Sequence, residues 1–170
     1  MRRALGLAQG AGRAGEVPVG ALVVDAAGRI VGEGANAPVA LHDPSAHAEI
    51  LALRAAGAAL GNYRLGGCVL VVTLEPCAMC AAALVHARVA GVVYGASDAL
   101  AGAVQSRLDL LDAAMGGHRV WHMGGILGEE CARLLQAFFA RRRRETDSPA
   151  RGGVAPPGPA GSLPGNRAPR

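Results

Sequence analysis

Two short motifs contain the residue types of a catalytic zinc site: HAE at residues 47–49 and PCAMC at residues 76–80. A catalytic zinc takes three protein ligands from His and Cys and leaves its fourth position to water. His47, Cys77 and Cys80 supply that number. Zinc lowers the pKa of bound water from near 16 to roughly 7, so a nucleophile becomes available at neutral pH. The motifs therefore predict metal-assisted hydrolysis.

Glu49 completes the first motif without being an expected ligand. It lies two positions after His47, about 200° around an ideal helix, so the two side chains do not share a helix face. We therefore predict that Glu49 carries protons in the reaction.

Helix starts are expected to position these side chains. Cys77 and Cys80 are three residues apart and share one face of a helix. Pro76 suits the first turn of that helix, whose N-terminus favours thiolate over thiol. Asp43 and Pro44 read as the cap and first turn of an earlier helix. Both groups of ligands are therefore predicted at helix N-termini.

The pair of cysteines has two other interpretations. A Cys-x-x-Cys pair is also typical of a thiol redox motif or of half a structural zinc site. A redox motif does not need His-x-Glu upstream, and a structural site needs a fourth ligand at short spacing, which neither Cys68 nor Cys131 offers. A catalytic site is therefore favoured. The other histidines lack such company and are interpreted as structural or surface residues: His42, His86, His118 and His122.

The remaining pattern alternates helices and strands, which predicts an α/β layered domain. The expected helices are Arg2 to Ala14, Ala46 to Leu60, Cys80 to Arg88 and Gly128 to Arg144. The expected strands are Val19 to Asp25 and Arg29 to Glu33, joined by a turn at residues 25–28, then Cys68 to Thr73, Gly91 to Tyr94 and one within Met115 to Met123. The third strand delivers Cys77 at its carboxyl end, where α/β proteins favour active sites.

Length and composition predict one compact domain over residues 1–145, since 170 residues with 51% hydrophobic content can bury a sizeable core. We expect a soluble, cytoplasmic protein, because no cleavable leader, disulfide framework or membrane span is evident. Residues 146–170 hold six of the ten prolines and are predicted to be a disordered tail. A polyproline docking segment is the weaker interpretation, and we assign the tail no function.

A basic run near the end of the last expected helix follows two aromatic residues. The formal net charge of +4 suits a polyanionic partner. Basic residues also favour a helix C-terminus, which explains one or two of them. Four in a row beside two aromatics favour a phosphate-binding edge next to a stacking surface. The residues predicted to contact RNA are Phe138, Phe139, Arg141, Arg142, Arg143 and Arg144.

Two longer strings resemble those of a known family. HDPSAHAE at residues 42–49, with TLEPCAMC at 73–80, resembles the bacterial tRNA-specific adenosine deaminases of the cytidine deaminase-like superfamily. The resemblance runs from roughly residue 1 to residue 144. Further matching stretches are EVPVGA at 16–21, GEGAN at 32–36, NYRL at 62–65, HRV at 118–120 and FF at 138–139.

The resemblance implies a three-layer α/β/α fold with a central mixed five-stranded sheet and one zinc ion per subunit. It implies hydrolytic deamination of adenosine to inosine at the wobble position, 34, of tRNA, with an arginine tRNA read by ACG as the expected substrate. The expected partners are the tRNA anticodon stem-loop and a second copy in a homodimer, with no membrane. It assigns Asn36 to the edge of the base, Ala48 to the substrate and Asp98 to the ribose. Without it, Asn36 reads as a turn residue and Asp98 as a cap.

The sequence departs from the family pattern in two places. Leu100 stands where the family often has Lys, which removes a phosphate contact. Met1 enters the middle of the family's first helix, so either the natural start lies upstream or the helix is shorter here.

Other classes of protein share parts of this signature. A deaminase of a free base or nucleotide, such as guanine, cytosine or dCMP, has the same zinc motif. A non-catalytic RNA-binding protein stabilised by zinc is a second alternative, although folding would not require Glu49. A thiol oxidoreductase is the weakest alternative.

Overall fold

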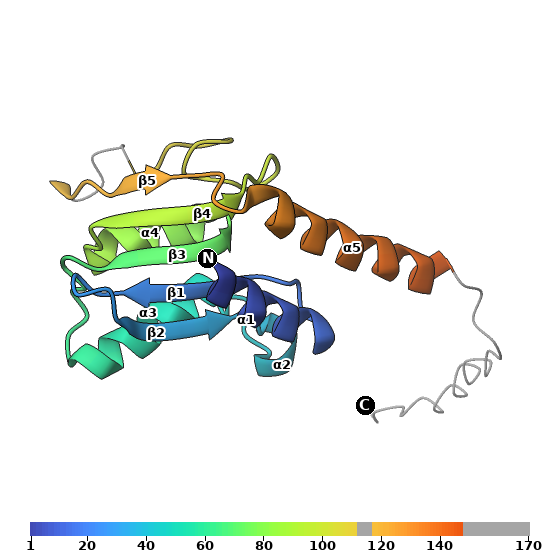
Figure 1. Ribbon diagram of the computed structural model, residues 1–170, viewed down its shortest axis with the longest axis horizontal. Helices are drawn as coiled ribbons and strands as arrows, with labels where there is room; N and C mark the ends of the chain where they lie inside the picture. Colours follow the sequence, from blue (N-terminus) through green and yellow to red (C-terminus); the bar gives the residue numbers. More distant parts are fainter. Residues whose placement is uncertain (112–116, 148–170) are drawn as a thin grey trace, which may run out of the picture.

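The computed structural model of this chain describes residues 1–111 and 117–147, which form a central sheet with helices on both faces (Figure 1). In chain order the elements are α1 (Arg2–Arg13), β1 (Gly20–Val24), β2 (Ile30–Ala35), α2 (Pro38–Leu41), α3 (Ala48–Leu60), β3 (Val69–Leu74), α4 (Ala78–Ala87), β4 (Gly91–Ala96), β5 (Trp121–Met123) and α5 (Gly128–Asp147).

The sheet is mixed, as the family resemblance implied. Its strand order is β2-β1-β3-β4-β5. β1 is antiparallel to both β2 and β3, while β3, β4 and β5 run parallel. Helices α1 and α5 lie on one face and α3 and α4 on the other (Figure 1). The predicted three-layer fold is therefore confirmed, and the carboxyl ends of β3 and β4 meet at one edge.

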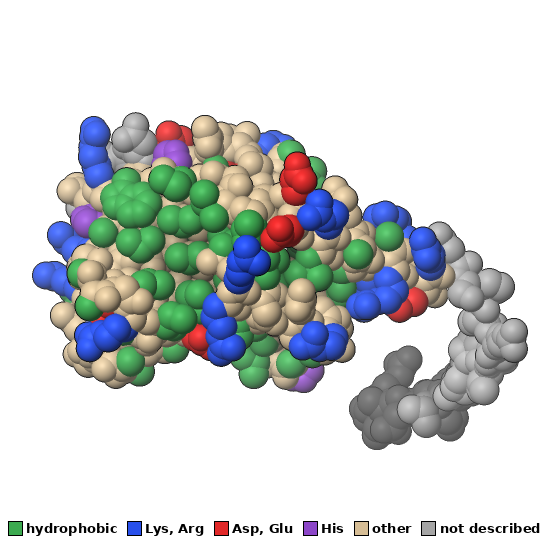
Figure 2. All heavy atoms as spheres, in the orientation of Figure 1, with side chains coloured by type: hydrophobic (Ala, Val, Ile, Leu, Met, Phe, Trp, Pro, Cys, Tyr) green, Lys and Arg blue, Asp and Glu red, His purple; other side chains and the backbone are tan. Residues whose placement is uncertain are grey.

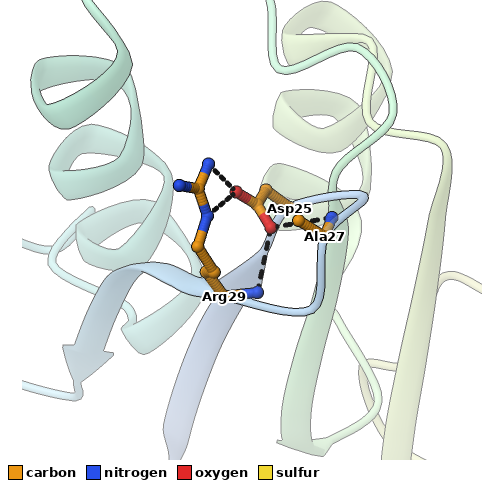
Figure 3. A network of polar contacts seen from close by, with 3 residues as sticks. All are labelled: Asp25, Ala27 and Arg29. Atoms are coloured by element: carbon orange, nitrogen blue, oxygen red, sulfur yellow. Dashed lines mark hydrogen bonds and ion pairs between the residues drawn. The ribbon is translucent and has the colours of Figure 1, made fainter.

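The predicted hairpin turn is confirmed, and Asp25 organises it (Figure 3). Asp25 Oδ1 accepts hydrogen bonds from the N–H groups of Ala27 (3.0 Å) and Arg29 (2.9 Å). Its Oδ2 pairs with the Arg29 guanidinium at 2.7 Å. The N–H and side chain of Arg29 hold the pKa of Asp25 below its usual range. Gly28 completes the turn at φ +80°, which suits glycine.

Helix α3 lies unusually close to β2 because small residues line both elements. A Cβ at Gly34 would lie 2.6 Å from the Ala52 nitrogen, and one at Gly32 would lie 2.7 Å from the Ala56 nitrogen. Ala48, Ala52 and Ala56 are fully buried against the strand. The absence of side chains at Gly32 and Gly34 therefore sets the position of α3, whose first turn carries site residues.

Helix α3 begins two residues later than the start predicted at Ala46. Its N-cap is His47, so the prediction that Asp43 and Pro44 form its cap and first turn is wrong. Asp43 instead accepts hydrogen bonds from the N–H (2.8 Å) and hydroxyl (2.7 Å) of Ser45. This local turn satisfies the Asp43 side chain before the helix starts.

Helix α4 begins at Ala78, two residues before the start predicted at Cys80. Its N-cap is Cys77, so Pro76 precedes the cap and does not lie in the first turn. The Pro76 carbonyl accepts a hydrogen bond from the N–H of Ala103 (2.8 Å). A long-range contact therefore places this proline outside the helix.

The last strand, β5, lies within the span from Met115 to Met123 that was predicted to hold it, which confirms that prediction. Residues 112–116 lie outside the described part of the chain, and pairing with β4 begins at Trp121, opposite Gly91. Before this point the His118 ring donates a hydrogen bond to the Val89 carbonyl (2.7 Å). β4 itself starts at Gly91, which is where its pairing with β5 begins.

Helix α5 is longer than the predicted span from Gly128 to Arg144. It continues through residues 146 and 147, the first two of the segment predicted to be disordered, and residues 148–170 lie outside the described part of the chain. No described helix combines the length and apolar character needed to cross a membrane.

Candidate metal centre and active site

The structure brings the three predicted ligands together, although 30 residues separate His47 from Cys77. His47 and Cys77 are the N-caps of α3 and α4, and Cys80 lies in the first turn of α4. Their ligand atoms all lie within 4.8 Å of one another. The prediction that both groups lie at helix N-termini is confirmed, and two of the predicted ligands are the N-caps themselves.

The distances fit a tetrahedral zinc ion. His47 Nδ1 lies 3.7 Å from Cys77 Sγ and 3.6 Å from Cys80 Sγ. Ligands at the usual zinc distances from sulfur and nitrogen are about 3.6 Å apart when the coordination is tetrahedral. Among the His, Cys, Asp and Glu side chains of the described residues, these three lie close enough together to share a metal ion. Three ligands leave one coordination position for water or substrate.

The helix start also prepares Cys77 to bind a cation. A hydrogen bond from the Cys80 thiol, with backbone N–H groups and the nearby His47, lowers the pKa of Cys77 to about 5. The pKa of Cys80 is raised, because its thiol donates this hydrogen bond to Cys77 and because the residue is buried. Because zinc binds thiolates and the pKa of Cys80 is raised, metal binding must release a proton from Cys80.

Glu49 lies beside the ligands and outside the ligand group. Its side chain is 4% exposed. Burial raises the pKa of Glu49, while its own N–H and the Cys80 thiol oppose that shift through hydrogen bonds. A buried carboxyl group beside the three predicted ligands is well placed to exchange protons with a reactant held there.

Asn36 holds the start of α3. Its Oδ1 accepts a hydrogen bond from the N–H of Ala48 (2.9 Å). The side chain of Ala48 is fully buried, so its predicted contact with substrate stays a prediction. The Asn36 oxygen is used by the protein, which leaves its amino group as the end able to meet a base.

Asp98 caps a turn, as its sequence context predicted when the family resemblance was left aside. Its Oδ1 accepts hydrogen bonds from the N–H groups of Leu100 (2.9 Å) and Ala101 (3.0 Å). Its predicted place near the ribose stays a prediction. Leu100 is 86% exposed, as expected for a side chain at a surface that meets a large partner or solvent.

The aromatic pair on α5 is split between core and surface. Phe138 is 6% exposed and Phe139 is 44% exposed, with the rings edge to face at 5.4 Å. The guanidinium carbon of Arg141 lies 5.5 Å from the centroid of the Phe138 ring. The same guanidinium donates a hydrogen bond to the Gly12 carbonyl, with 3.2 Å between nitrogen and oxygen. Phe138 and Arg141 therefore have structural contacts, and Phe139 has the more accessible ring.

The end of α5 carries the basic run away from the sheet. α5 begins at the edge of the sheet where β4 ends, with Gly128 against Gly95, and projects beyond it (Figure 1). Figure 2 shows basic side chains gathered on this projecting end. Arg142, Arg143 and Arg144 are exposed. The structure does not bring this run into the metal centre, which fits contact with a large substrate.

Two buried carboxylates that hold neighbouring segments in place, Glu16 and Glu75, were not singled out from the sequence. Glu16 accepts hydrogen bonds from the N–H groups of Val39 (3.3 Å) and Ala40 (2.8 Å), at the start of α2. Burial alone would raise the pKa of Glu75, yet hydrogen bonds from Ser106 and backbone N–H groups hold it below its usual range. In the sequence, Glu75 could have been noticed because it is an acidic residue between an apolar strand and the cysteine motif.

A family model, a protein of known function and a solved structure all match this chain to deaminases. Residues 1–96 match the family model of the cytidine and deoxycytidylate deaminase zinc-binding region. The chain is 48% identical over 145 residues to the tRNA-specific adenosine deaminase of Haemophilus influenzae, covering 85% of this chain and 84% of that protein. A solved structure of a tRNA:A34 deaminase that edits the wobble position superposes with a TM-score of 0.77 at 42% identity, covering 79% of this chain and 97% of that one.

Two further similarities show how this domain occurs elsewhere. The chain is 49% identical over 150 residues to the tRNA(Ile)-lysidine synthase of Deinococcus deserti, covering 88% of this chain and 28% of that protein. The guanine deaminase of Nitrosomonas europaea has a TM-score of 0.69 at 28% identity, covering 82% of each chain. The fold therefore also occurs in a larger protein and in an enzyme named for a free base.

Proposed function

We propose, because this chain belongs to the tRNA-specific adenosine deaminases, that it hydrolyses adenosine to inosine at the wobble position, 34, of tRNA and releases ammonia. The carrying observation is that His47, Cys77 and Cys80 converge at zinc-binding distances beside the buried Glu49. Identity of 48% over most of the chain to an enzyme of this name supports the choice of substrate.

The residues around the metal centre divide the chemistry between them. When bound, one zinc per subunit would be held by the three ligands and would make water nucleophilic at neutral pH. Glu49 takes a proton from the water that attacks C6 of the adenine. It delivers this proton to the ring nitrogen, and it then moves the second proton of the attacking oxygen to the amine, which leaves as ammonia. Its burial keeps bulk water from competing for these protons.

We also propose contacts with the substrate, which the family resemblance suggests. Asn36 presents its amino group to the edge of the base, because its oxygen is held by the N–H of Ala48. Asp98 lies near the ribose. An anticodon loop offers splayed, unstacked bases, which suits a site that must enclose one base. An arginine tRNA with the anticodon ACG is the proposed substrate, and the cytoplasm, where tRNA is used, is the proposed location.

The projecting end of α5 is proposed to bind the phosphates of the tRNA. Arg142, Arg143 and Arg144 are exposed, whereas Arg141 is engaged by the protein. Phe139 offers a stacking surface beside them. Replacing these three arginines with glutamine should reduce the slope of log K against log salt by about two to three. Arg133→Gln, on the same helix, is the matched control, because that arginine pairs with Glu129. An unchanged slope in the triple variant would show that these arginines do not contact the tRNA phosphates and are only solvated at the end of the helix.

We also propose a homodimer with one zinc in each subunit. An open cavity of about 810 Å³ lies between α3 and α4 and is lined by apolar side chains that include Ile50, Leu53 and Ala83. A second copy would cover this surface. Light scattering should give about twice the chain mass of 17.1 kDa. A mass of one chain at micromolar concentration would contradict the dimer.

The deciding experiment supplies the zinc-loaded protein with unmodified ACG arginine tRNA and, separately, with free adenine, guanine and cytosine bases and nucleosides. Inosine at position 34, read by sequencing, is expected with tRNA alone. Glu49→Ala should retain zinc and fold but lose activity by about two to four orders of magnitude, since it removes the proton carrier. Ammonia from a free base with unedited tRNA would reassign the protein to base deamination, an activity for which the guanine deaminase is named.

A further inference from the structure

Glu75 is a buried carboxylate to which the reaction described above gives no role. It follows the last residue of β3 and precedes Pro76 and the ligand Cys77. Its N–H donates to the Ala96 carbonyl at the end of β4 (2.8 Å), and its side chain is 2% exposed. The sheet therefore fixes the backbone of Glu75, two residues from a metal ligand.

Segment 98–106 encloses the carboxylate of Glu75. Oε2 accepts hydrogen bonds from the N–H of Asp98 (3.0 Å) and from the Ser106 hydroxyl. Oε1 accepts from the N–H groups of Val104 (3.3 Å), Gln105 (2.8 Å) and Ser106 (2.8 Å). In the described part of the chain, its hydrogen-bond donors are thus backbone N–H groups and a hydroxyl. Such a ring of N–H groups binds an anion without a paired cation.

The same segment also rests on the metal-binding turn. Gly102 forms an antiparallel bridge with Cys77, and the N–H of Ala103 donates to the Pro76 carbonyl (2.8 Å). A Cβ at Gly102 would lie 2.5 Å from Glu75 Oε2, so only glycine fits this approach. A shift of the Glu75 carboxylate would therefore move segment 98–106 relative to Cys77.

We propose that Glu75 is a positioning residue that fixes segment 98–106, with Asp98, against the turn carrying Cys77. It thereby sets one wall of the substrate pocket. This role rests on the proposed function, because Asp98 is assigned there to the ribose. A carboxylate suits the task since it offers two acceptor oxygens and no donor to a ring of donors.

Glu75→Gln tests this role, because glutamine keeps the size but offers one acceptor atom. The three N–H groups at Oε1 favour the glutamine oxygen there, which directs its amino group at the N–H of Asp98. Amide exchange at Asp98, followed by NMR, should accelerate about tenfold or more, while Gln105 and Ser106 stay protected. The KM for tRNA should rise about tenfold, with kcat and zinc content within about twofold of wild type.

Two variants serve as comparisons. Glu33→Gln makes the same chemical change at a carboxylate that pairs with Arg3 on the surface, and should alter none of these readouts. Ser106→Ala removes the hydroxyl and leaves the N–H groups, so it should raise KM less than Glu75→Gln does.

Unchanged exchange at Asp98 and unchanged KM in Glu75→Gln would overturn the positioning role. Loss of zinc together with kcat would also overturn it, because Glu75 would then support the ligand turn rather than the pocket wall. Failure of the proposed function is separately visible: wild-type protein would leave tRNA unedited, while amide exchange at Asp98 still reports whether Glu75 holds the segment.

Discussion

Adding a single methyl group to β2 should damage the active site through α3. A Cβ at Gly34 would lie 2.6 Å from the Ala52 nitrogen and closer still to the Ala48 carbonyl oxygen. Ordinary contact begins at 3.4 Å, so strand and helix must separate by at least 0.8 Å. Both obstructing atoms belong to the backbone, so no side-chain rotation relieves the clash. The first turn of α3, which carries Glu49 and follows His47, must move.

The expected size follows from opposing effects. Overpacking costs about 1–3 kcal/mol, and the smaller unfolded-state entropy of alanine offsets about 0.4–1 kcal/mol. With the middle of each range, Gly34→Ala should therefore lose about 1.3 kcal/mol of unfolding free energy, or about 3–5 °C in Tm for a chain of this length. A misplacement near 1 Å in a reacting geometry costs about a hundredfold, so kcat should fall tenfold to a hundredfold.

Two other glycines make the test selective. Gly32→Ala meets α3 one turn further on, with the Ala56 nitrogen at 2.7 Å, and should cost similar stability but less activity. Gly6→Ala, with nothing within 4 Å on the exposed face of α1, should stabilise the protein by about 0.5–1 kcal/mol. Thermal unfolding and single-turnover deamination of a tRNA measure both quantities. Equal activity losses for Gly32→Ala and Gly34→Ala, or an unperturbed Gly34→Ala, would refute displacement of the α3 start as the cause.

Two further perturbations address the turn and the metal. Because the folded-state pKa of Asp25 is lowered, its contribution is present above the unfolded value of about 3.9 and is lost as pH falls through the folded value. Asp25→Asn should therefore flatten the fall of Tm between pH 5 and pH 3, and an unchanged slope would assign acid sensitivity to other carboxylates. Removing the metal with a chelator should abolish deamination and lower Tm, since ligand binding to the folded state stabilises it, and zinc should restore both. Full activity with less than one-tenth of a metal ion per chain would contradict a metal-dependent reaction.

The sequence alone determined the features that depend on residue type and short spacing. The three ligands and Glu49 were predicted from their chemistry, and the structure brings the ligands together with Glu49 outside their group. The hairpin turn at Asp25 was predictable because its contacts join residues two and four positions apart. The family strings also predicted the mixed five-stranded sheet, which the structure confirms.

Only the tertiary structure decided which groups near the site hold it together. Glu75 contacts residues 23 to 31 positions away, and no local pattern specifies such partners. The start of α4 was misplaced for the same reason, because Pro76 is held by Ala103. The start of α3 was misplaced because Asp43 caps a local turn at Ser45 and does not cap the helix. The sequence thus determined which side chains carry the chemistry, whereas packing between distant segments decided how closely α3 and segment 98–106 approach them.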